Sequence, residues 1–283
     1  MSPRKSPPAV DARTAPSADL DSVRLRRLVD DTVDASVDEP LGAYLFASHE
    51  RGSEIGRHVE RTVFLEAFGN TPELLEKEYG PYEEASVFFC VVDHRRRQPA
   101  GVMRVILPGD AGPGLKSLND VEPTWGFPGS VLLRRAGASA PLDATWDIAT
   151  LAVMPEYRGN AAAGLVSVAL YQSEVLAALA AGVDWMVAIL DETVHRMARL
   201  AFSQPFVPFA PARSYLGSPA SFPVYVQLSE WSERLASGHP AVHDVIFRGS
   251  GIEAAVRPLD LERSSRIVGT RGAEVEEGGR RTA

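Results

Sequence analysis

The stretch VMPEYRGNAAAGLV, residues 153–166, carries the clearest sign of a fold in this chain of 283 residues. An apolar run ends at Pro155, and Arg158 and Gly159 then precede a run of small residues that favours a helix. A strand that turns directly into a helix leaves several backbone N–H groups at the helix start without partners. These groups and the helix dipole favour an anion, and small residues let a phosphate approach the backbone. The stretch is therefore typical of a phosphate-binding turn, and a plain strand–turn–helix is the alternative.

The segments around this turn alternate between strand and helix patterns. Helices are predicted over residues 54–69, 71–80, 161–182 and 193–204. Strands are predicted over residues 85–93, 101–109, 145–153, 184–191 and 222–231. The first two strands are joined by a short charged turn and are expected to form an antiparallel hairpin, whereas the Gly- and Pro-rich stretch 108–140 shows no clear pattern. A hairpin followed by a strand–helix–strand unit predicts an α/β protein with a mixed sheet covered by helices.

The two ends of the chain differ in composition from its middle. Residues 1–20 are rich in Pro, Ser and Ala without periodicity, and residues 257–283 also lack a periodic pattern. Both segments are therefore predicted to be disordered tails. No internal repeat lies between them, so a single domain over residues 21–256 is predicted. Hydrophobic residues form 45% of the chain, which is enough for a sizeable core.

Charge and residue counts exclude several classes of function. The formal net charge is −8, which argues against nucleic acid as a partner, because such proteins gather Lys and Arg around phosphates. The single cysteine, Cys90, lies in an apolar strand pattern and forms no internal disulfide. No His or Cys spacing suits a metal, so no metal site is predicted. The N-terminus lacks a signal-peptide pattern, and the apolar stretch 175–190 is interrupted by Gly182 and Asp184, so a cytoplasmic protein without a membrane span is expected.

The turn at 153–166 resembles the acyl-CoA-binding motif of the GNAT superfamily of N-acetyltransferases. That motif reads V-x-P-x-(F/Y)-(Q/R)-(G/N/R)-x-G-x-(G/A) between a strand and a helix. The matching residues are Val153, Pro155, Tyr157, Arg158, Gly159 and Ala163. Ala161 stands where the motif has its middle glycine; it adds one methyl group and keeps the backbone N–H.

This resemblance implies a mostly antiparallel mixed sheet flanked by helices, with a β–α–β core that binds acyl-CoA. It further implies that the backbone of the strand meets the thioester and that the loop holds the pyrophosphate. The residues carried over to this role are Leu151, Val153, Arg158, Gly159, Asn160, Ala161, Ala163 and Gly164.

The upstream part of the chain resembles one branch of this superfamily, the acyl-homoserine-lactone synthases and the related N-acyl amino acid synthases. The matching residues are Arg61, Val63, Phe64, Glu78, Glu83 and Arg104. Gly80 replaces a third acidic residue, and Thr150 replaces an arginine three residues after Asp147. These two departures argue against a homoserine-lactone product. The resemblance implies substrate contacts by Arg61, Phe64 and Arg104, although Phe64 also fits a core position and Arg104 also fits an ion pair with Glu78.

Acyl transfer to an amine needs a bound thioester, a proton acceptor and stabilisation of the oxyanion. Asp147, Glu78 and Glu83 are the candidate bases, and burial beside Trp146 is expected to raise the pKa of Asp147. Each of the three acids also fits a structural role, at a strand end, a helix end or a turn. Tyr215 is a candidate proton donor to the leaving thiol.

The sequence therefore predicts an N-acyltransferase that uses acyl-CoA or an acyl carrier protein as co-substrate and an amine as acceptor. No permanently bound cofactor is expected. Two alternatives remain open. The first is a non-catalytic module that keeps the fold and binds acyl thioesters or a partner. The second is an unrelated mixed α/β protein that binds neither donor.

Overall fold

The computed structural model describes residues 22–33, 37–109, 113–158, 161–203 and 205–277, with backbone alone at 161–163 and 270–277. The strands are β1 (Leu41–Ala47), β2 (Ser86–Asp93), β3 (Gln98–Ile106), β4 (Thr145–Val153), β5 (Trp185–Asp191), β6 (Val207–Pro208), β7 (Arg213–Tyr215), β8 (Ser218–Gln227) and β9 (Val256–Arg257). The helices are α1 (Ser22–Thr32), α2 (Ser53–Phe68), α3 (Pro72–Tyr79), α4 (Lys116–Trp125), α5 (Gly129–Arg135), α6 (Ala161–Ala180), α7 (Glu192–Phe202), α8 (Leu228–Gly238), α9 (Pro240–Arg248) and α10 (Leu261–Glu277). Short 3-10 turns are η1 (Gly80–Ala85), η2 (Leu142–Ala144) and η3 (Pro155–Tyr157).

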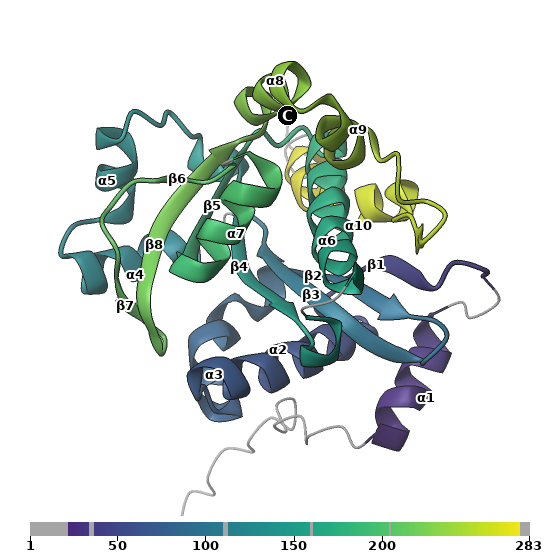
Figure 1. Cartoon of the computed structure of the whole chain (residues 1–283). Helices are drawn as coiled ribbons and strands as arrows, with labels where there is room; N and C mark the ends of the chain where they lie inside the picture. Colours follow the sequence, from purple (N-terminus) through teal and green to yellow (C-terminus); the bar gives the residue numbers. More distant parts are fainter. Residues whose placement is uncertain (1–21, 34–36, 110–112, 159–160, 204, 278–283) are drawn as a thin grey trace, which may run out of the picture.

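The described strands form one mixed sheet in the order β6-β8-β5-β4-β3-β2-β1-β9, with β7 paired to β8 (Figure 1). Neighbouring strands run antiparallel except for β4 with β5 and β1 with β9, which are parallel. The predicted hairpin is β2 and β3, and the predicted strand–helix–strand unit is β4, α6 and β5. The predicted fold class is therefore confirmed, with β4 at its predicted bounds.

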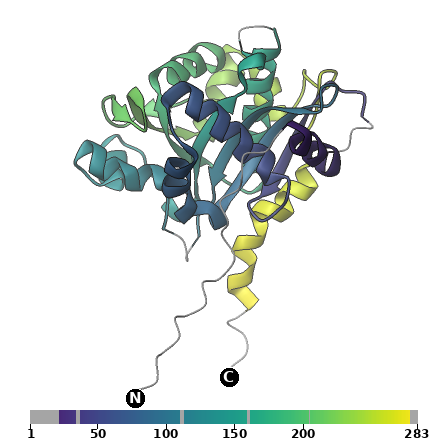
Figure 2. The ribbon, with the colours of Figure 1, turned by 90° about the horizontal axis from the view of Figure 1, so that it is seen from below.

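Helices α2 and α6 cover opposite faces of the sheet (Figures 1 and 2). A Cβ atom added to Gly101 in β3 would lie 2.7 Å from Val166 of α6. The next residue, Val102, contacts the α2 side, because a Cβ added to Gly56 would lie 2.9 Å from it. Successive residues of a strand point to opposite faces, so the two helices are separated by the sheet. Helices α3 and α4 share the α2 face.

Strand β4 contains a bulge at Ala149. Arg104 of β3 pairs with Thr150, and Val105 pairs with Ile148, so Ala149 is an extra residue in β4. Residues three apart in a regular strand point to opposite faces. The bulge instead turns Asp147 and Thr150 to the same face, where their side chains reach α4 and α2 respectively.

Four parts of the structure differ from the sequence expectations or were not placed by them. The last predicted strand, 222–231, is β8 over Ser218–Gln227, and α8 begins at Leu228 because Asp184 accepts hydrogen bonds from the first amides of that helix. The unplaced stretch 108–140 forms α4 and α5, which cover a smaller apolar cluster around Leu118 and Trp125. Strand β1, absent from the predicted set, pairs along the whole of its length with β2.

The C-terminal tail is the fourth difference, since the expected disordered segment 257–283 contains the helix α10. Leu259 and Ser264 are buried, and Arg263 donates to Leu45 O and to Glu50 Oε1. These contacts are distant in sequence, so composition alone does not report them. The predicted tail at 1–20 lies outside the described residues. Among the described helices, none combines the length and apolar character needed to cross a membrane.

Candidate active site

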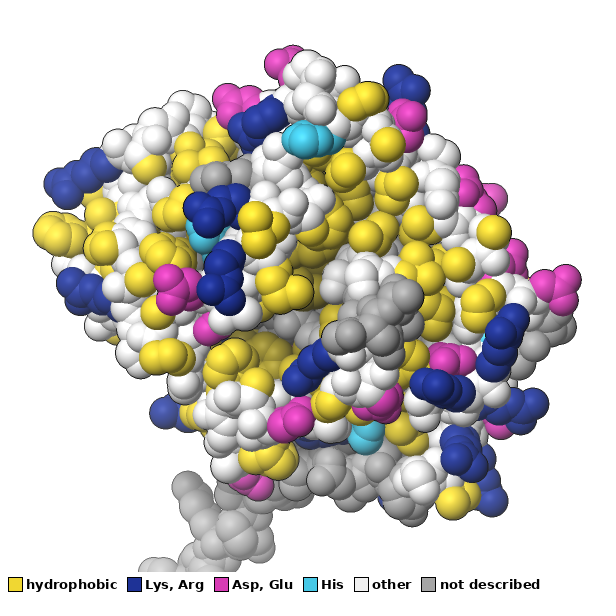
Figure 3. Space-filling model, viewed as in Figure 1, with side chains coloured by type: hydrophobic (Ala, Val, Ile, Leu, Met, Phe, Trp, Pro, Cys, Tyr) yellow, Lys and Arg dark blue, Asp and Glu magenta, His cyan; other side chains and the backbone are white. Residues whose placement is uncertain are grey.

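A cleft opens where β4 and β5 separate. Within the described residues the two strands pair only between Thr145–Ile148 and Trp185–Ala188. Beyond these pairs lies a cavity of about 70 Å³, whose walls come from both strands and from α2, α3 and the turn after β7. The space-filling view shows a hollow below α7 with hydrophobic side chains around it (Figure 3). The separation of two central strands thus creates a small apolar cleft inside the sheet.

The backbone of β4 directs two amide groups into this gap. Met154 N donates to Ala100 O at 2.9 Å, and alternate residues of an antiparallel strand bond to the same neighbour. The amides of Thr150 and Met154 therefore face β3, and those of Leu151 and Val153 face the side of β5. Leu151 also lines the cavity. These are the two strand residues that the sequence resemblance assigned to thioester binding.

The turn after β4 holds its arginine against the strand. Arg158 Nε donates to Val153 O at 2.8 Å, and Arg158 Nη1 lies 3.6 Å from Glu66 Oε2 on α2. The Arg158 side chain keeps 41% of its surface exposed. It is therefore anchored at its Nε and still accessible to a ligand. Gly159 and Asn160, also predicted to bind the cofactor, lie outside the described residues.

The first turn of α6 contains Ala161, Ala163 and Gly164. A Cβ atom added to Gly164 would meet no atom of the described residues within 4 Å, so none of these residues fills the space in front of this glycine. Backbone N–H groups at a helix start favour an anion. The open approach and the nearby arginine fit the phosphate-binding role that the sequence pattern predicts.

Tyr215 lies at one wall of the cleft, inside a charged cluster from α3 and α4. Its hydroxyl donates to the Asp120 carboxylate and accepts from Lys116 Nζ at 3.2 Å. Lys116, only 3% exposed, also pairs with Asp120 and lies 3.1 Å from Glu78 Oε2. Burial, with the neighbouring Tyr79 and Asp120, raises the pKa of Tyr215. Of the predicted catalytic residues, Glu78 and Tyr215 thus belong to one cluster, joined by Lys116.

Asp147 is fully buried at the base of α4. Its two carboxylate oxygens accept from Ser117 N at 2.7 Å and from Ser117 Oγ at 2.6 Å. The cap position of α4, Leu115, offers no side-chain acceptor, so Asp147 caps this helix from the sheet. Burial raises the pKa of Asp147 to about 6 although both bonds from Ser117 lower it, in the direction expected from the sequence. Asp147 is not among the described residues that line the cavity.

Glu83 and Arg104 meet in an ion-pair network on the α2 face. Arg104 donates through Nε and Nη2 to Glu60 at 3.0 and 2.7 Å, and through Nη1 to Glu83 at 3.2 Å. Arg57 binds the other oxygen of Glu83, and Thr150 donates to Glu60. Burial would lower the pKa of Arg104, but the two carboxylates outweigh it and raise the pKa.

This network changes the interpretation of Arg104. The alternative in which Arg104 pairs with Glu78 is wrong, because Glu78 pairs with Lys116 and Arg104 pairs with two other acids. All three guanidinium nitrogens of Arg104 already donate to carboxylates. Its part in the structure is to tie β3 to α2 and η1.

The two predicted substrate contacts on α2 differ in position. Phe64 lines the cleft beside Phe68, with ring centroids 5.7 Å apart. Arg61 is not among the described lining residues, and its nearest carboxylate is Glu54 at 3.8 Å. Its Nε and Nη2 are buried without a hydrogen-bond partner in the described part of the chain. The structure therefore brings Phe64 to the cleft and leaves Arg61 outside its lining.

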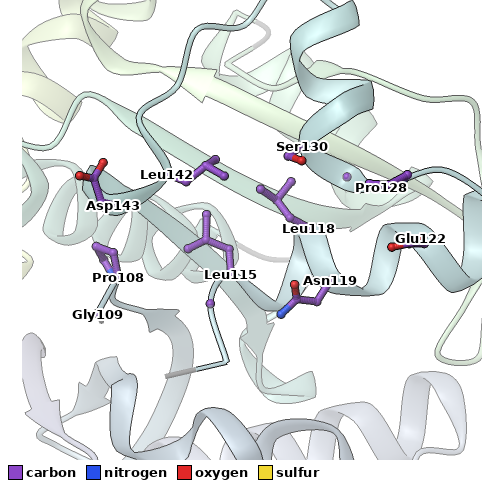
Figure 4. Close-up of a pocket in the computed structure, with 12 residues that line it drawn as sticks. Pro108, Gly109, Leu115, Leu118, Asn119, Glu122, Pro128, Ser130, Leu142 and Asp143 are labelled. Atoms are coloured by element: carbon purple, nitrogen blue, oxygen red, sulfur yellow. The ribbon is translucent and has the colours of Figure 1, made fainter. Parts of the chain in front are cut away.

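A second and larger cavity lies on the other side of α4, between α4, α5 and the turn before β4 (Figure 4). Its volume is about 470 Å³, and its walls include Leu115, Leu118 and Leu142 with the carboxylates Glu122 and Asp143. None of the residues predicted to be catalytic or to bind CoA is among its described lining residues. The predicted site residues that line a cavity therefore lie at the smaller cleft. Among the residues described, no three His, Cys, Asp or Glu side chains are grouped to hold a metal ion.

Sequence reasoning missed Glu60, Lys116 and Asp120. Glu60 carried a signal, because it lies on the apolar face of the predicted helix 54–69 between Val59 and Val63. An acid there indicates a buried partner. Lys116 and Asp120 are spaced i,i+4, the spacing of a helical ion pair, but they lie in the unplaced stretch.

Among solved structures, FeeM, an N-acyl amino acid synthase from uncultured soil microbes, is similar to this chain. It has a TM-score of 0.52 and 15% identity, and the match covers 71% of this chain and 98% of FeeM. BjaI, a CoA-dependent acyl-homoserine lactone synthase, matches with a TM-score of 0.49 and 14% identity over 80% of this chain and 99% of BjaI. No protein-family model and no curated protein matches the sequence.

The chain has a GNAT-like fold, which it shares with the N-acyl amino acid synthase FeeM. In this chain the separation of β4 from β5 opens the cleft, and the bulge residue Ala149 lines it. The predicted resemblance is confirmed at the level of the fold.

Proposed function

We propose that the chain transfers an acyl group from a thioester, acyl-CoA or an acyl carrier protein, to an amine acceptor. The observation that carries the proposal is the gap between β4 and β5, into which the amides of Leu151 and Val153 point. The gap ends at the turn into α6, so a thioester can lie in it while its phosphates reach the helix start.

In the proposed complex, a β4 amide donates to the thioester carbonyl oxygen and stabilises the oxyanion that forms during attack. Removing one such donor from other acyl-transfer enzymes lowers the rate by about 10²–10³-fold. The phosphates approach the open space before Gly164, where the exposed part of Arg158 supplies a positive charge. Phe64 and Phe68 pack against the acyl group.

Tyr215 lines the cleft, and its hydroxyl is proposed as the proton donor to the leaving thiol. Among the three predicted bases, Glu78 is connected to Tyr215 through Lys116. Glu83 is held by Arg57 and Arg104, and Asp147 is held by Ser117. The proposal therefore places the proton transfers on the α4 side of the cleft.

The test is release of free thiol from acetyl-CoA, from a long-chain acyl-CoA and from an acyl carrier protein, against a panel of primary amines. Binding of CoA is measured in parallel by calorimetry. Turnover with one donor and one amine is the expected result, and the preferred donor identifies which thioester the cleft takes. Binding of CoA without thiol release from any donor would favour the non-catalytic module. Absence of both CoA binding and thiol release would mean that the chain has this fold but binds neither thioester donor.

A further inference from the structure

The cluster around Tyr215 contains more acid–base groups than a proton donor alone requires. A phenol both donates and accepts hydrogen bonds, and Tyr215 does both here. It donates to Asp120 and accepts from Lys116 at 3.2 Å. An ammonium group in the cleft can donate to the same phenolic oxygen that Lys116 reaches. The tyrosine thus connects the cleft to a carboxylate on its far side.

We propose that Asp120 receives the proton of the acceptor amine through Tyr215 and that Lys116 positions both residues for this relay. The inference rests on the proposed acyltransferase function and names its proton path. It makes Tyr215 the group that touches the acceptor, and Asp120 and Lys116 the residues that act through it.

The acceptor ammonium gives one proton to the Tyr215 oxygen while the Tyr215 proton passes to Asp120. Asp120, 22% exposed, then releases that proton to solvent. The nitrogen lone pair forms the C–N bond, the C–S bond breaks, and its electron pair leaves on sulfur. A second proton, lost from nitrogen after attack, passes through Tyr215 to the thiolate.

The surroundings of the phenol favour a relay over a tyrosinate base. Two acids, Glu78 and Asp120, and one cation, Lys116, lie around it, with Tyr79 on the α3 side. Burial and these negative charges raise the pKa of Tyr215, so its anion is disfavoured and the proton has to move on to a carboxylate.

Lys116 fixes the geometry of the pair. Its ammonium group binds Asp120 and lies 5.0 Å from the centroid of the Tyr79 ring. It is 3% exposed, and a buried ammonium strongly favours fixed partners because solvent does not compensate its charge. In the proposed reaction, Lys116 therefore holds the Asp120 carboxylate and the Tyr215 hydroxyl in contact with each other.

The experiment compares the pH profile of kcat for the full chain with those of Tyr215→Phe, Asp120→Asn and Asp120→Glu. Thiol release from acetyl-CoA is followed with hexylamine, benzylamine and ethanolamine as acceptors. Tyr215→Phe and Asp120→Asn should each lower kcat about 100-fold, the scale of general acid–base catalysis, and leave KM for acetyl-CoA unchanged. Asp120→Asn should also abolish the acid limb of the profile, and Asp120→Glu should restore it. Glu122→Gln, on the opposite side of α4, is the matched control and should behave as wild type.

Two results overturn the inference, and they are distinguishable. If the wild type releases thiol and Asp120→Asn keeps the acid limb, the relay is wrong and the proposed function stands. If the wild type binds CoA and releases no thiol with any acceptor, the proposed function fails and the relay fails with it. Calorimetric binding of CoA by each variant shows that a lost rate does not come from a lost fold.

Discussion

The two helices that cover opposite faces of the sheet each bury a glutamate, and the molecule treats the two differently. Glu60 on α2 is 4% exposed and holds Arg104 through both oxygens, with Thr150 as a second partner. Glu174 on α6 is 1% exposed, and its Oε1 has no hydrogen-bond partner among the described residues. Burial raises the pKa of Glu174 to about 8. The buried acid on the α2 face thus has an arginine and a threonine as partners, whereas the buried acid on the α6 face favours the neutral form.

This difference separates two uses of a buried acid. On the α2 face, charges tie β3 and β4 to the helix that carries Phe64, so electrostatics there maintains the walls of the cleft. On the α6 face burial instead favours the protonated form of Glu174, and its Oε1 has no hydrogen-bond partner among the described residues. Removal of the acid should therefore lower the free energy of unfolding on the α2 face and raise it on the α6 face.

The largest expected effect is that of Glu60→Leu, which leaves the Arg104 guanidinium without its main partner in a buried position. Breaking a buried ion pair lowers the free energy of unfolding by about 3–5 kcal/mol. Urea unfolding at neutral pH measures the loss. Glu66→Gln, on the exposed side of the same helix, is the control and should change stability by less than about 0.5 kcal/mol. A loss below about 1 kcal/mol for Glu60→Leu would contradict the role given to the network.

Glu174→Gln should instead stabilise the protein, by roughly 4 kcal/mol near pH 8. The folded state holds this proton up to about pH 8, whereas the unfolded chain loses it near the ordinary value of 4.5. Between these two values the folded state binds more protons, so the free energy of unfolding of the wild type falls as pH rises. The glutamine variant lacks this part of the slope. The measurement is the unfolding midpoint of Glu174→Gln and of the exposed Glu233→Gln across this pH window. If the midpoints of the two variants depend equally on pH, Glu174 does not hold its proton in the folded state.

The α6 side is expected to contribute to ligand binding at its N-terminal end. Arg158→Glu should weaken binding of CoA at least about tenfold, which corresponds to about 1.4 kcal/mol, because it reverses a charge beside the phosphate approach. The melting temperature should stay close to that of the wild type, since the Arg158 side chain is 41% exposed. Arg248→Glu on α9 is the control for overall charge. Unchanged affinity in Arg158→Glu would return the turn to a plain strand–turn–helix.

The smallest effect concerns two helical glycines without neighbours. A Cβ at Gly164 or at Gly269 meets no atom of the described part of the chain within 4 Å, so alanine at either position should raise the free energy of unfolding by about 0.5–1 kcal/mol. In Gly164→Ala the same methyl group enters the space proposed for the phosphates, and CoA should bind severalfold more weakly. Gly269→Ala should gain stability without any change in CoA binding. Calorimetry on the two variants separates these effects, and equal affinities would remove Gly164 from the site.

The centre of the fold was predictable because its signals are local. The strand 145–153, the turn at Arg158 and the following helix form one continuous pattern, and a helix start has the same backbone chemistry in any protein. The hairpin of β2 and β3 likewise follows from two apolar runs and a charged turn. Of the residues assigned to the site from the sequence, Leu151 and Phe64 line the cleft.

The charged side chains were less predictable, because their partners come from distant segments. Glu60 meets Arg104 across 44 residues, and Tyr215 meets Asp120 across 95 residues. Helix α4 has a proline inside it and lacks a capping side chain of its own, since Asp147 on β4 supplies the cap. A pattern that depends on a cap from another element is not visible in the helix's own sequence. The same holds for α10, where Arg263 bonds to Leu45 across 218 residues.

The return of the C-terminal segment has a practical consequence for anyone who shortens this chain. β9 pairs with the outer edge of β1 at Leu41 and Gly42, and Arg263 of α10 bonds to the backbone of β1 at Leu45. By composition the segment looks dispensable, so it invites removal before expression or crystallisation. Its loss would turn β1 into an uncovered sheet edge of apolar residues, and such edges recruit strands from other molecules. Precipitation of a truncated form would then indicate an exposed edge of β1 and not a failure of the chain to fold.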